Sequence, residues 1–344
     1  MKATFQKYTL QFKQPSGTSR GVMTHKETWL LKIDLNGKIG IGECGLLRGL
    51  SIDDRPDYEA KLQWVCENIE KGEEWLWDQL IEFPSLQFGV EMAFRSLGST
   101  EPFLLFPSEF TAAQKSIPIN GLVWMGTPDF MRQQIDEKIQ AGFRCIKLKI
   151  GAIDFEKELD LLRMIRQHFT ADAIEIRVDA NGAFSSNDAL FKLRQISQFE
   201  IHSIEQPIAT RQFEAMAELC QNTPIDIALD EELIGVFGLT EKEALLQKIK
   251  PQYLILKPSF IGGFHGTLEW ITLAKKYKIG WWITSALESN IGLNAIAQFT
   301  YSLQNPMPQG LGTGALYTNN FDCPLEVAGG QLWYRSGIRW KFNL

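Results

Sequence analysis

Four charged residues lie at the ends of strand-like runs and recur with nearly one period. They are Asp179, Glu205, Asp230 and Lys257, which are 26, 25 and 27 positions apart. The runs that they close span residues 174–179, 202–205, 227–230 and 253–257. A period of this length accommodates a strand, a helix and two short loops of a βα repeat. Because the strands of a parallel barrel end at one mouth, the spacing predicts that these charged side chains converge there.

Two lysines end a further run upstream. Lys147 and Lys149 alternate with Ile146, Leu148 and Ile150, so on a strand the two lysines would share one face. A half-buried edge strand would show the same pattern, and this alternative stays open. On a central barrel strand, both amines would instead point inward beside the carboxylates. There, partial burial and a nearby cation would lower the pKa of a lysine toward neutrality and make it a usable base.

The three carboxylates at one mouth predict a site for a hard divalent cation, since Mg²⁺ prefers oxygen ligands. Each carboxylate alone has a structural explanation, because Asp179 and Asp230 could cap helices and Glu205 could be an exposed residue. Three of them in phase favour a common site. A zinc site is not expected, because the histidines show no HxxxH spacing. They are His25, His168, His202 and His265.

A cation between two lysine-bearing walls suits one type of reaction. A substrate carboxylate binds the cation, one lysine removes the weakly acidic α-proton, and the cation and the second lysine neutralise the enediolate that results. Enolase-type sites combine a lysine base with Mg²⁺ in this way. Lys257 would face such a site from the wall opposite Lys149, although it could also simply close a strand before Pro258.

The barrel that would position these residues is predicted to span residues 113–321. Its outer helices should be amphipathic, as in 154–169, where Phe155, Leu159, Leu162 and Ile165 recur at helical spacing. Further helices are expected at 187–197, 212–220, 240–248, 266–277 and 291–302. Further strands are expected at 117–120 and 280–284, and a weak one at 310–312.

Residues 1–112 predict a separate α+β capping domain, which the strand-like tail at 322–344 is expected to complete. Residues 30–43 alternate around Asn36-Gly37, a strong hairpin signal, and helical apolar stripes follow at 58–69 and 85–97. Two glycine-bearing loops, 14–22 and 45–50, are expected to close over the barrel mouth. Their alternative is that they are ordinary surface loops.

Composition bounds the classes of function. The chain has 344 residues, a formal net charge of −6 and no cluster of Lys and Arg, which argues against nucleic-acid binding. No apolar run is long enough to cross a membrane, and the N-terminus lacks the apolar core of a signal peptide. Five scattered cysteines without a CxxC pair indicate reduced thiols. We therefore expect a cytoplasmic protein with a small-molecule substrate and neither nucleic-acid nor membrane partners, and a homo-oligomer is left open.

These motifs together resemble the muconate-lactonizing subgroup of the enolase superfamily over nearly the whole chain. They are Lys147-x-Lys149, Val178-Asp179-Ala180-Asn181, Glu205-Gln206-Pro207, Asp230-Glu231 and Leu256-Lys257-Pro258-Ser259. The resemblance implies an α/β fold, a modified (β/α)7β TIM-like barrel with an α+β capping domain. It also implies Mg²⁺, with Mn²⁺ as a substitute, on Asp179, Glu205 and Asp230. Lys149 and Lys257 would be catalytic, on either side of the substrate's α-carbon, and Lys147 would be an electrostatic neighbour of Lys149.

Within that subgroup, three segments resemble the o-succinylbenzoate synthase family. They are Thr284–Gly292, Gly310–Gly314 and Arg177, two residues before the first metal ligand. The resemblance implies a lyase of menaquinone biosynthesis, which dehydrates 2-succinyl-6-hydroxy-2,4-cyclohexadiene-1-carboxylate to 2-succinylbenzoate. Lys149 would take the α-proton and return it to the departing hydroxide in a syn elimination, while Lys257 stays cationic. The implied substrate-binding residues are Lys147, Arg177, Asn181, Ser285 and Ala286. Ser285 could instead cap a helix, and Arg177 could be a structural ion-pair partner.

Three rival functions stay open. The same machinery could racemise N-succinylamino acids or epimerise dipeptides, although Gly312-Thr313-Gly314 lacks the Asp-x-Asp that dipeptide epimerases use to hold an ammonium group. A lyase that forms a Schiff base on Lys149 or Lys257 would need no metal. A metal-binding barrel without catalysis is disfavoured, because all the charged residues are retained.

Overall fold

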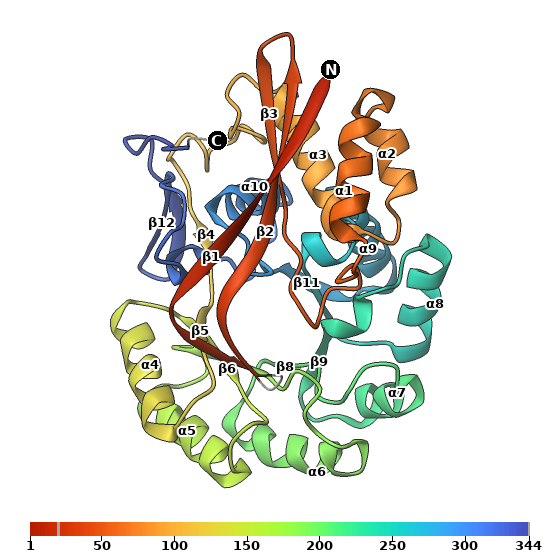
Figure 1. The fold of residues 1–344 in the computed structure, drawn as a ribbon. Helices are drawn as coiled ribbons and strands as arrows, with labels where there is room; N and C mark the ends of the chain where they lie inside the picture. Colours follow the sequence, from red (N-terminus) through yellow and green to blue (C-terminus); the bar gives the residue numbers. More distant parts are fainter. Residues whose placement is uncertain (19–20, 343–344) are drawn as a thin grey trace.

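The computed structural model describes residues 1–18 and 21–342, so Ser19 and Arg20 of the predicted loop 14–22 lie outside the described part. Three strands begin the chain and form one antiparallel sheet in the order β1-β2-β3. They are β1 (Lys2–Thr18), β2 (Gly21–Leu35) and β3 (Lys38–Cys44). The predicted turn joins β2 to β3, where Asn36 and Gly37 have φ of 55° and 87°. Figure 1 shows the long β1–β2 hairpin crossing in front of the barrel.

Helices cover this sheet and complete the first core. The closest contact joins β3 to α3, because a Cβ atom on Gly42 would lie only 1.9 Å from the carbonyl oxygen of Gly89. Glycine at position 42 therefore lets the helix backbone lie directly on the strand. The helical elements are α1 (Tyr58–Glu67), η1 (Ile69–Lys71), α2 (Glu73–Gln79) and α3 (Pro84–Gly98).

Parallel strands form the second and larger sheet. In the described residues, its seven strands run in the order β11-β10-β9-β8-β7-β6-β5, so neighbours along the chain are neighbours in the sheet. This is the arrangement of a barrel wall built from βα repeats. The strands are β5 (Gly121–Val123), β6 (Cys145–Lys149), β7 (Glu175–Asp179), β8 (Ser203–Glu205), β9 (Asp226–Leu229), β10 (Tyr253–Leu256) and β11 (Gly280–Ile283).

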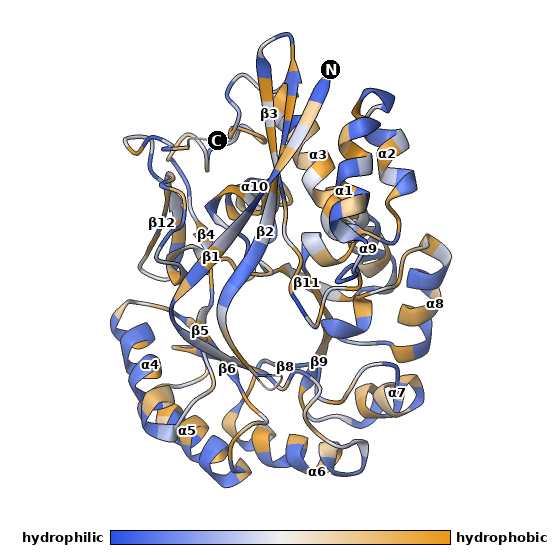
Figure 2. Ribbon diagram, in the orientation of Figure 1, coloured by the Kyte–Doolittle hydropathy of each residue, from blue (hydrophilic) through white to orange (hydrophobic). Residues whose placement is uncertain are grey.

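The helices between these strands lie on the outside of the barrel, and α4 to α8 mix hydrophobic and hydrophilic residues as amphipathic helices do (Figure 2). The expected helices are all present, and α4 is an additional one. The side chain of Thr127 caps its first turn, and Pro128 occupies its first position. The helices are α4 (Pro128–Gln140), α5 (Phe155–His168), α6 (Ser186–Ile196), α7 (Phe213–Asn222), α8 (Leu239–Ile249), α9 (Gly263–Tyr277) and α10 (Asn290–Ser302). Short 3₁₀ turns are η2 (Ser197–Phe199), η3 (Glu231–Leu233), η4 (Pro258–Phe260) and η5 (Gly314–Leu316).

One buried residue, Gln309, closes the barrel in place of a full eighth strand. Gly310 forms a single parallel bridge to Thr284, and Gln309 forms one to Ile119. The side chain of Gln309 also accepts a hydrogen bond from the amide of Ile283, at 2.8 Å. The weak strand expected at 310–312 is therefore reduced to isolated bridges.

The start of the barrel and the tail differ from the expectation. The predicted strand 117–120 is divided: β4 (Ile117–Pro118) pairs with β13 of the tail, and the barrel proper starts at β5. The tail strands are β12 (Leu325–Ala328) and β13 (Gln331–Tyr334), and neither pairs with β1–β3 among the described residues. The tail does contact the first part of the chain, because the Trp340 ring stacks on Phe103 with centroids 4.1 Å apart. The boundaries at residues 112 and 321 stay predictions.

Two expectations from composition can be compared with the structure. All five cysteines are free and buried, in agreement with the expected reduced thiols. Among the described helices, none is both long enough and apolar enough to span a membrane.

Candidate active site

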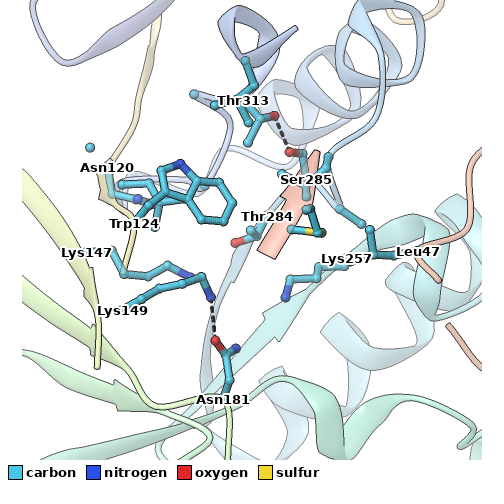
Figure 3. Close-up of a pocket in the computed structure, with 18 of the residues that line it drawn as sticks. Leu47, Asn120, Trp124, Lys147, Lys149, Asn181, Lys257, Thr284, Ser285 and Thr313 are labelled. Carbon is cyan, nitrogen blue, oxygen red and sulfur yellow. Dashed lines mark hydrogen bonds between the residues drawn. The ribbon is translucent and has the colours of Figure 1, made fainter. Parts of the chain in front are cut away.

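A cavity of about 450 Å³ lies at the mouth of the barrel. Its wall is formed by residues at the carboxyl ends of the strands and by residues of the β1–β2 hairpin and the loop after β3. Both segments expected over the mouth line it, but only residues 47–50 do so as a loop, because Gln14 lies in β1 and Val22 in β2. Figure 3 shows Lys147 and Lys149 on one side of this cavity and Lys257 on the other.

The three predicted carboxylates lie side by side beneath this cavity. Asp179 and Glu205 are the last residues of β7 and β8 and are paired in the sheet register. Asp230 immediately follows β9. All three are at most 3% exposed. The common period of the strand ends has therefore brought together the side chains that it predicted.

Lys147 and Lys149 approach these carboxylates from β6, which lies between β5 and β7 and is buried along its whole length. The edge-strand alternative is therefore wrong. Lys147 Nζ donates to Asp179 Oδ2 at 3.1 Å and to Glu205 Oε2 at 2.8 Å. Lys149 Nζ donates to Asp179 Oδ2 and to Asn181 Oδ1, both at 2.8 Å.

Lys257 reaches the same carboxylates from the opposite wall. Its Nζ donates to Asp230 Oδ2 and lies 3.9 Å from Glu205 Oε1. Both Lys149 and Lys257 line the cavity. The two amines thus face one space from opposite sides, as expected from the position of Lys257 four strands further round the barrel.

Burial and ion pairing act in opposite directions on these groups. Burial tends to lower the pKa of Lys147, but the carboxylates of Asp179 and Glu205 outweigh it, so this pKa is raised. The pKa of Lys257 is likewise raised, because Asp230 and Glu205 outweigh burial. The lowering expected for the lysines of β6 is therefore not found for Lys147, since its ammonium faces carboxylates, whereas the raised pKa of Lys257 agrees with the cationic role expected of it.

The carboxylates respond in different directions. Burial tends to raise the pKa of Asp179, but Lys147 and Lys149 outweigh it and hold this pKa low. The pKa of Asp230 is also low, because Lys257 outweighs burial. For Glu205, burial and the neighbouring Asp179 prevail, so its pKa is well above the ordinary value. Of the three carboxylates, Glu205 is therefore the one whose negative charge the neighbouring lysines do not fully stabilise.

The donor set fits a divalent cation, although the side chains are not arranged around one. Among residues 1–18 and 21–342, no group of three or more His, Cys, Asp or Glu has the arrangement of a metal site. The ammonium groups of Lys147 and Lys257 lie against the carboxylates instead. Buried Glu205 Oε1 accepts no hydrogen bond from any described residue. Three buried carboxylates, one with an unused oxygen, are the donors that Mg²⁺ prefers.

Of the predicted substrate-binding residues, Lys147, Asn181, Ser285 and Ala286 line the cavity. Asn181 links the two halves of the mouth, because its Oδ1 accepts from Lys149 and its Nδ2 donates to Glu231 Oε1 at 3.0 Å. The Ser285 hydroxyl is 2.5 Å from that of Thr313 and does not cap α10, whose N-cap is Ser289. Figure 3 shows Ser285 and Thr313 together at the far wall.

Arg177 does not reach the cavity, which corrects its predicted contact with substrate. It shares a strand face with Asp179 but lies two residues deeper in the barrel, where it is 1% exposed. Its Nε donates to Glu175 Oε1 at 2.7 Å, and its guanidinium lies 4.0 Å from the centroid of the Trp282 ring. Arg177 therefore has the ion-pairing role that was its alternative.

Several lining residues had no signal in the sequence. Trp124 and Asn120 form the wall beside Lys147, and Leu47 faces them from the loop after β3 (Figure 3). Asn120 ends the strand expected at 117–120 but carries no charge, and Trp124 and Leu47 belong to no repeating pattern. A systematic inspection of residues one or two positions beyond each strand would have included Trp124, which follows β5 directly.

Comparisons with known proteins agree with this geometry. Residues 130–338 match the family described as "Enolase C-terminal domain-like". An o-succinylbenzoate synthase from Desulfotalea psychrophila is 47% identical, over 96% of this chain and 98% of the relative. A D-Ala-D/L-Ala epimerase from Cytophaga hutchinsonii is 27% identical, over 96% of this chain and 90% of the relative.

Among solved structures, MenC from D. psychrophila superposes with a TM-score of 0.86 at 43% identity, covering 97% of this chain and 99% of that one. The predicted barrel with its capping domain is thereby confirmed. Both relatives align with 96% of this chain, but the synthase is 47% identical and the epimerase only 27%. The chain belongs to the enolase superfamily and, within it, to the o-succinylbenzoate synthase family.

Proposed function

We propose that this protein is a Mg²⁺-dependent o-succinylbenzoate synthase, a carbon–oxygen lyase of menaquinone biosynthesis that works in the cytoplasm. Its reaction would be the syn dehydration of 2-succinyl-6-hydroxy-2,4-cyclohexadiene-1-carboxylate to 2-succinylbenzoate. The observation that carries this proposal is the placement of Lys149 and Lys257 on opposite walls of one cavity, above three buried carboxylates. Near-full-length similarity to a synthase supports the choice of substrate.

The cation would be held by Asp179, Glu205 and Asp230, with Mn²⁺ as a substitute for Mg²⁺. When bound, it would act as a Lewis acid that stabilises negative charge on the substrate carboxylate. The unused oxygen of Glu205 supports this assignment. The ammonium groups that now contact the carboxylates would then be free to face the substrate.

Lys149, acting as a neutral amine, would remove the proton from the α-carbon of the substrate. Its amine is oriented by two acceptors, Asp179 and Asn181, and therefore has a defined direction into the cavity. The electron pair of the broken C–H bond forms the enediolate, and collapse of the enediolate expels the hydroxyl group. Lys149 returns the same proton to this leaving group, so that water departs and the ring becomes aromatic.

Lys257 would stay protonated throughout. Its pKa is raised because Asp230 and Glu205 outweigh burial, which suits a group that must remain a cation. From the opposite wall it would stabilise the charge that develops on the substrate carboxylate. The succinyl arm would lie toward Ser285 and Ala286, on the part of the wall formed by the loop after β11.

The test is an assay of the purified protein with Mg²⁺ and the cyclohexadiene substrate, monitored by the absorbance of the aromatic product. Turnover is expected for the wild type and loss of turnover for Lys149→Ala. The rival is racemisation of N-succinylamino acids, measured by exchange of the α-proton for deuterium. Exchange that proceeds far more efficiently than dehydration would overturn the proposal.

Epimerisation of dipeptides is disfavoured by the structure of the far wall. Dipeptide epimerases would hold the substrate ammonium with acidic residues at the position of 312–314. Here Thr313 is buried and its hydroxyl is engaged with Ser285. This wall therefore offers no carboxylate to an ammonium group.

A further inference from the structure

A buried polar cluster joins the first sheet to the barrel, outside the site described above. We call it the seam cluster. Every member is at most 3% exposed. Three members come from β2 and β3 and three from the barrel, and they are Lys26, Thr28, Glu43, Ser259, Glu288 and Ser289.

Glu43 makes the contacts that cross from sheet to barrel. Its Oε1 accepts from the amide of Ser289 at 2.9 Å and from the hydroxyl of Thr28 at 2.9 Å. Its Oε2 accepts from the hydroxyl of Ser289 at 2.5 Å and from the amide of Gly292 at 2.8 Å. Four donors thus converge on one carboxylate, and three of them belong to the start of α10.

The hydrogen bond between the amide of residue 292 and Glu43 requires a glycine at this position. A Cβ atom there would lie 2.9 Å from Glu43 Oε2 and 2.9 Å from the Cβ atom of Glu288. Such distances are below those of ordinary van der Waals contact. The absence of a side chain at position 292 therefore lets the Glu43 carboxylate reach the first turn of α10.

Glu288 connects two parts of the cavity wall. Its Oε2 accepts from the amide of Ala286 at 2.7 Å, and its Oε1 accepts from the hydroxyl of Ser259. Ser259 lies two residues after Lys257. Glu288 thus ties the loop after β11 to the loop that carries the cationic lysine.

Lys26 compensates the two carboxylates electrostatically. Its Nζ is buried and has no hydrogen-bond partner among the residues that the structure describes. It interacts with the charges of Glu288 and Glu43. An ammonium held only by neighbouring charge offsets one of the two carboxylate charges without fixing the direction of either carboxylate. The directions are therefore fixed by the hydrogen bonds of Glu43 and Glu288.

The segment held by this cluster is a wall of the cavity. Thr284, Ser285, Ala286 and Leu287 all line it, and Ser289 is the next residue but one. Leu287 has a φ of 64°, a left-handed conformation that is unfavourable for a residue with a side chain. Such a conformation persists only where the surroundings hold it in place.

We propose that Glu43 is a positioning residue for substrate binding. Through Ser289 and Gly292, it holds the 284–287 wall at a set distance from the lysines, although it does not touch the cavity itself. Loss of this contact should weaken substrate binding more than it slows proton transfer, because Lys149 and its partners lie elsewhere. The kinetic part of this inference rests on the proposed function.

The hydrogen bonds of the cluster suggest a matched pair of variants. Each oxygen of Glu43 faces a backbone N–H, so the amide group of Glu43→Gln must oppose one donor with another. Glu288 faces one N–H and one hydroxyl, and the hydroxyl can turn to accept a hydrogen bond. Both variants remove one buried negative charge beside Lys26. A difference between them therefore reports geometry rather than charge.

The experiment measures KM and kcat for dehydration in the two variants. Glu43→Gln is expected to raise KM about tenfold with kcat within about threefold of the wild type, as for loss of a charged hydrogen bond. Glu288→Gln is expected to change KM by at most about threefold. Equal effects of the two variants on KM, or a loss confined to kcat, would overturn the inference.

Hydrogen exchange gives a second readout that needs no activity. Glu43→Gln should accelerate exchange of the amides of residues 289–292 by about tenfold or more, and Glu288→Gln should do so much less. If Glu43→Gln fails to fold, Thr28→Val removes one donor to Glu43 Oε1 without changing α10 and should shift exchange in the same direction. Unchanged exchange in residues 289–292 would refute the positioning role. A wild type without dehydration activity would refute only the proposed function.

Discussion

Buried carboxylates occur in two regions of this molecule and are satisfied in different ways. At the barrel mouth, Asp179 and Asp230 face ammonium groups. At the contact between the first sheet and helices and the barrel, carboxylates face backbone N–H groups where helices begin. Glu43 accepts from the start of α10, and Glu91 accepts from the amides of Phe264 and His265 at the start of α9.

This difference in partners distinguishes carboxylates that can take part in a reaction from carboxylates that hold the structure together. An ammonium on a flexible stem can exchange one partner for another, and Glu205 still has one oxygen, Oε1, that accepts no hydrogen bond from the part of the chain that the structure describes. A backbone N–H at a helix start cannot leave without unwinding the helix. The mouth carboxylates can therefore take up a cation or release a lysine, whereas those at the helix starts hold two parts of the protein together.

Removal of divalent metal is the strongest way to test this contrast. Chelation with EDTA is expected to abolish dehydration, and added Mg²⁺ should restore it and raise the melting temperature through binding to the folded state. Calorimetric titration with Mg²⁺ would check the site directly. Activity that survives EDTA, together with trapping of a substrate adduct by borohydride, would favour the Schiff-base lyase instead.

Removal of the proposed base, Lys149, should have the next largest effect on activity. Lys149→Ala is expected to lower kcat by about 10²- to 10⁴-fold, because proton transfer by a positioned side chain contributes this much. The fold should persist, since Asp179 keeps its contact with Lys147. Thermal unfolding would verify this. Appreciable turnover in the variant would show that another group is the base.

Arg177 should behave as an architectural charge, although it lies only two residues from Asp179. Arg177→Met is expected to lower the free energy of unfolding by about 2 kcal/mol, because it leaves Glu175 without its partner. The kcat/KM of the folded protein should change little. Denaturant unfolding and the dehydration assay check the two parts. A large loss of activity at unchanged stability would show instead that Arg177 contacts the substrate.

The last prediction concerns pH and Glu91. Burial raises the pKa of Glu91 from 4.5 to about 8, so between these values the folded state binds the proton more tightly than the unfolded state. Stability should therefore fall as pH rises from 5 to 8, by on the order of 1 to 3 kcal/mol. Glu91→Gln removes the titratable group and should flatten this slope in denaturant unfolding, at a lower overall stability because its amide must oppose one of the two N–H donors. An unchanged slope would mean that Glu91 is ionised in the folded protein throughout.

The barrel and its charged mouth could be predicted because one simple rule links them. Parallel strands all end at one edge, so a regular period in sequence becomes proximity in space. Asp179, Glu205 and Asp230 follow this rule, and so does Lys257. The helices followed from the spacing of their apolar residues, with errors of a few residues at their ends. The helices α2 and α4 were missed, although Thr127-Pro128 is a good start for α4.

The remaining features depend on contacts between distant segments. The ion pair of Arg177 with Glu175 is local, but the Trp282 ring that covers its guanidinium is about a hundred residues away. Leu47 reaches the cavity only because β3 lies against the barrel. The position of the tail strands beside β4 has no local signal either. Periodicity within a segment carries no information on such pairings.

The closure of the barrel through Gln309 has a consequence for how the barrel moves. Seven strands are joined by continuous ladders, but the ring is completed by single bridges and one amide side chain. Two backbone hydrogen bonds on each side join this connection to its neighbours: Gln309 bonds to Pro118 and Asn120, and Gly310 bonds to Ile283 and Ser285. The first and last strands therefore meet through only two residues, so a shift of residues 309–310 would move both strands together with the wall that would receive the substrate's succinyl arm.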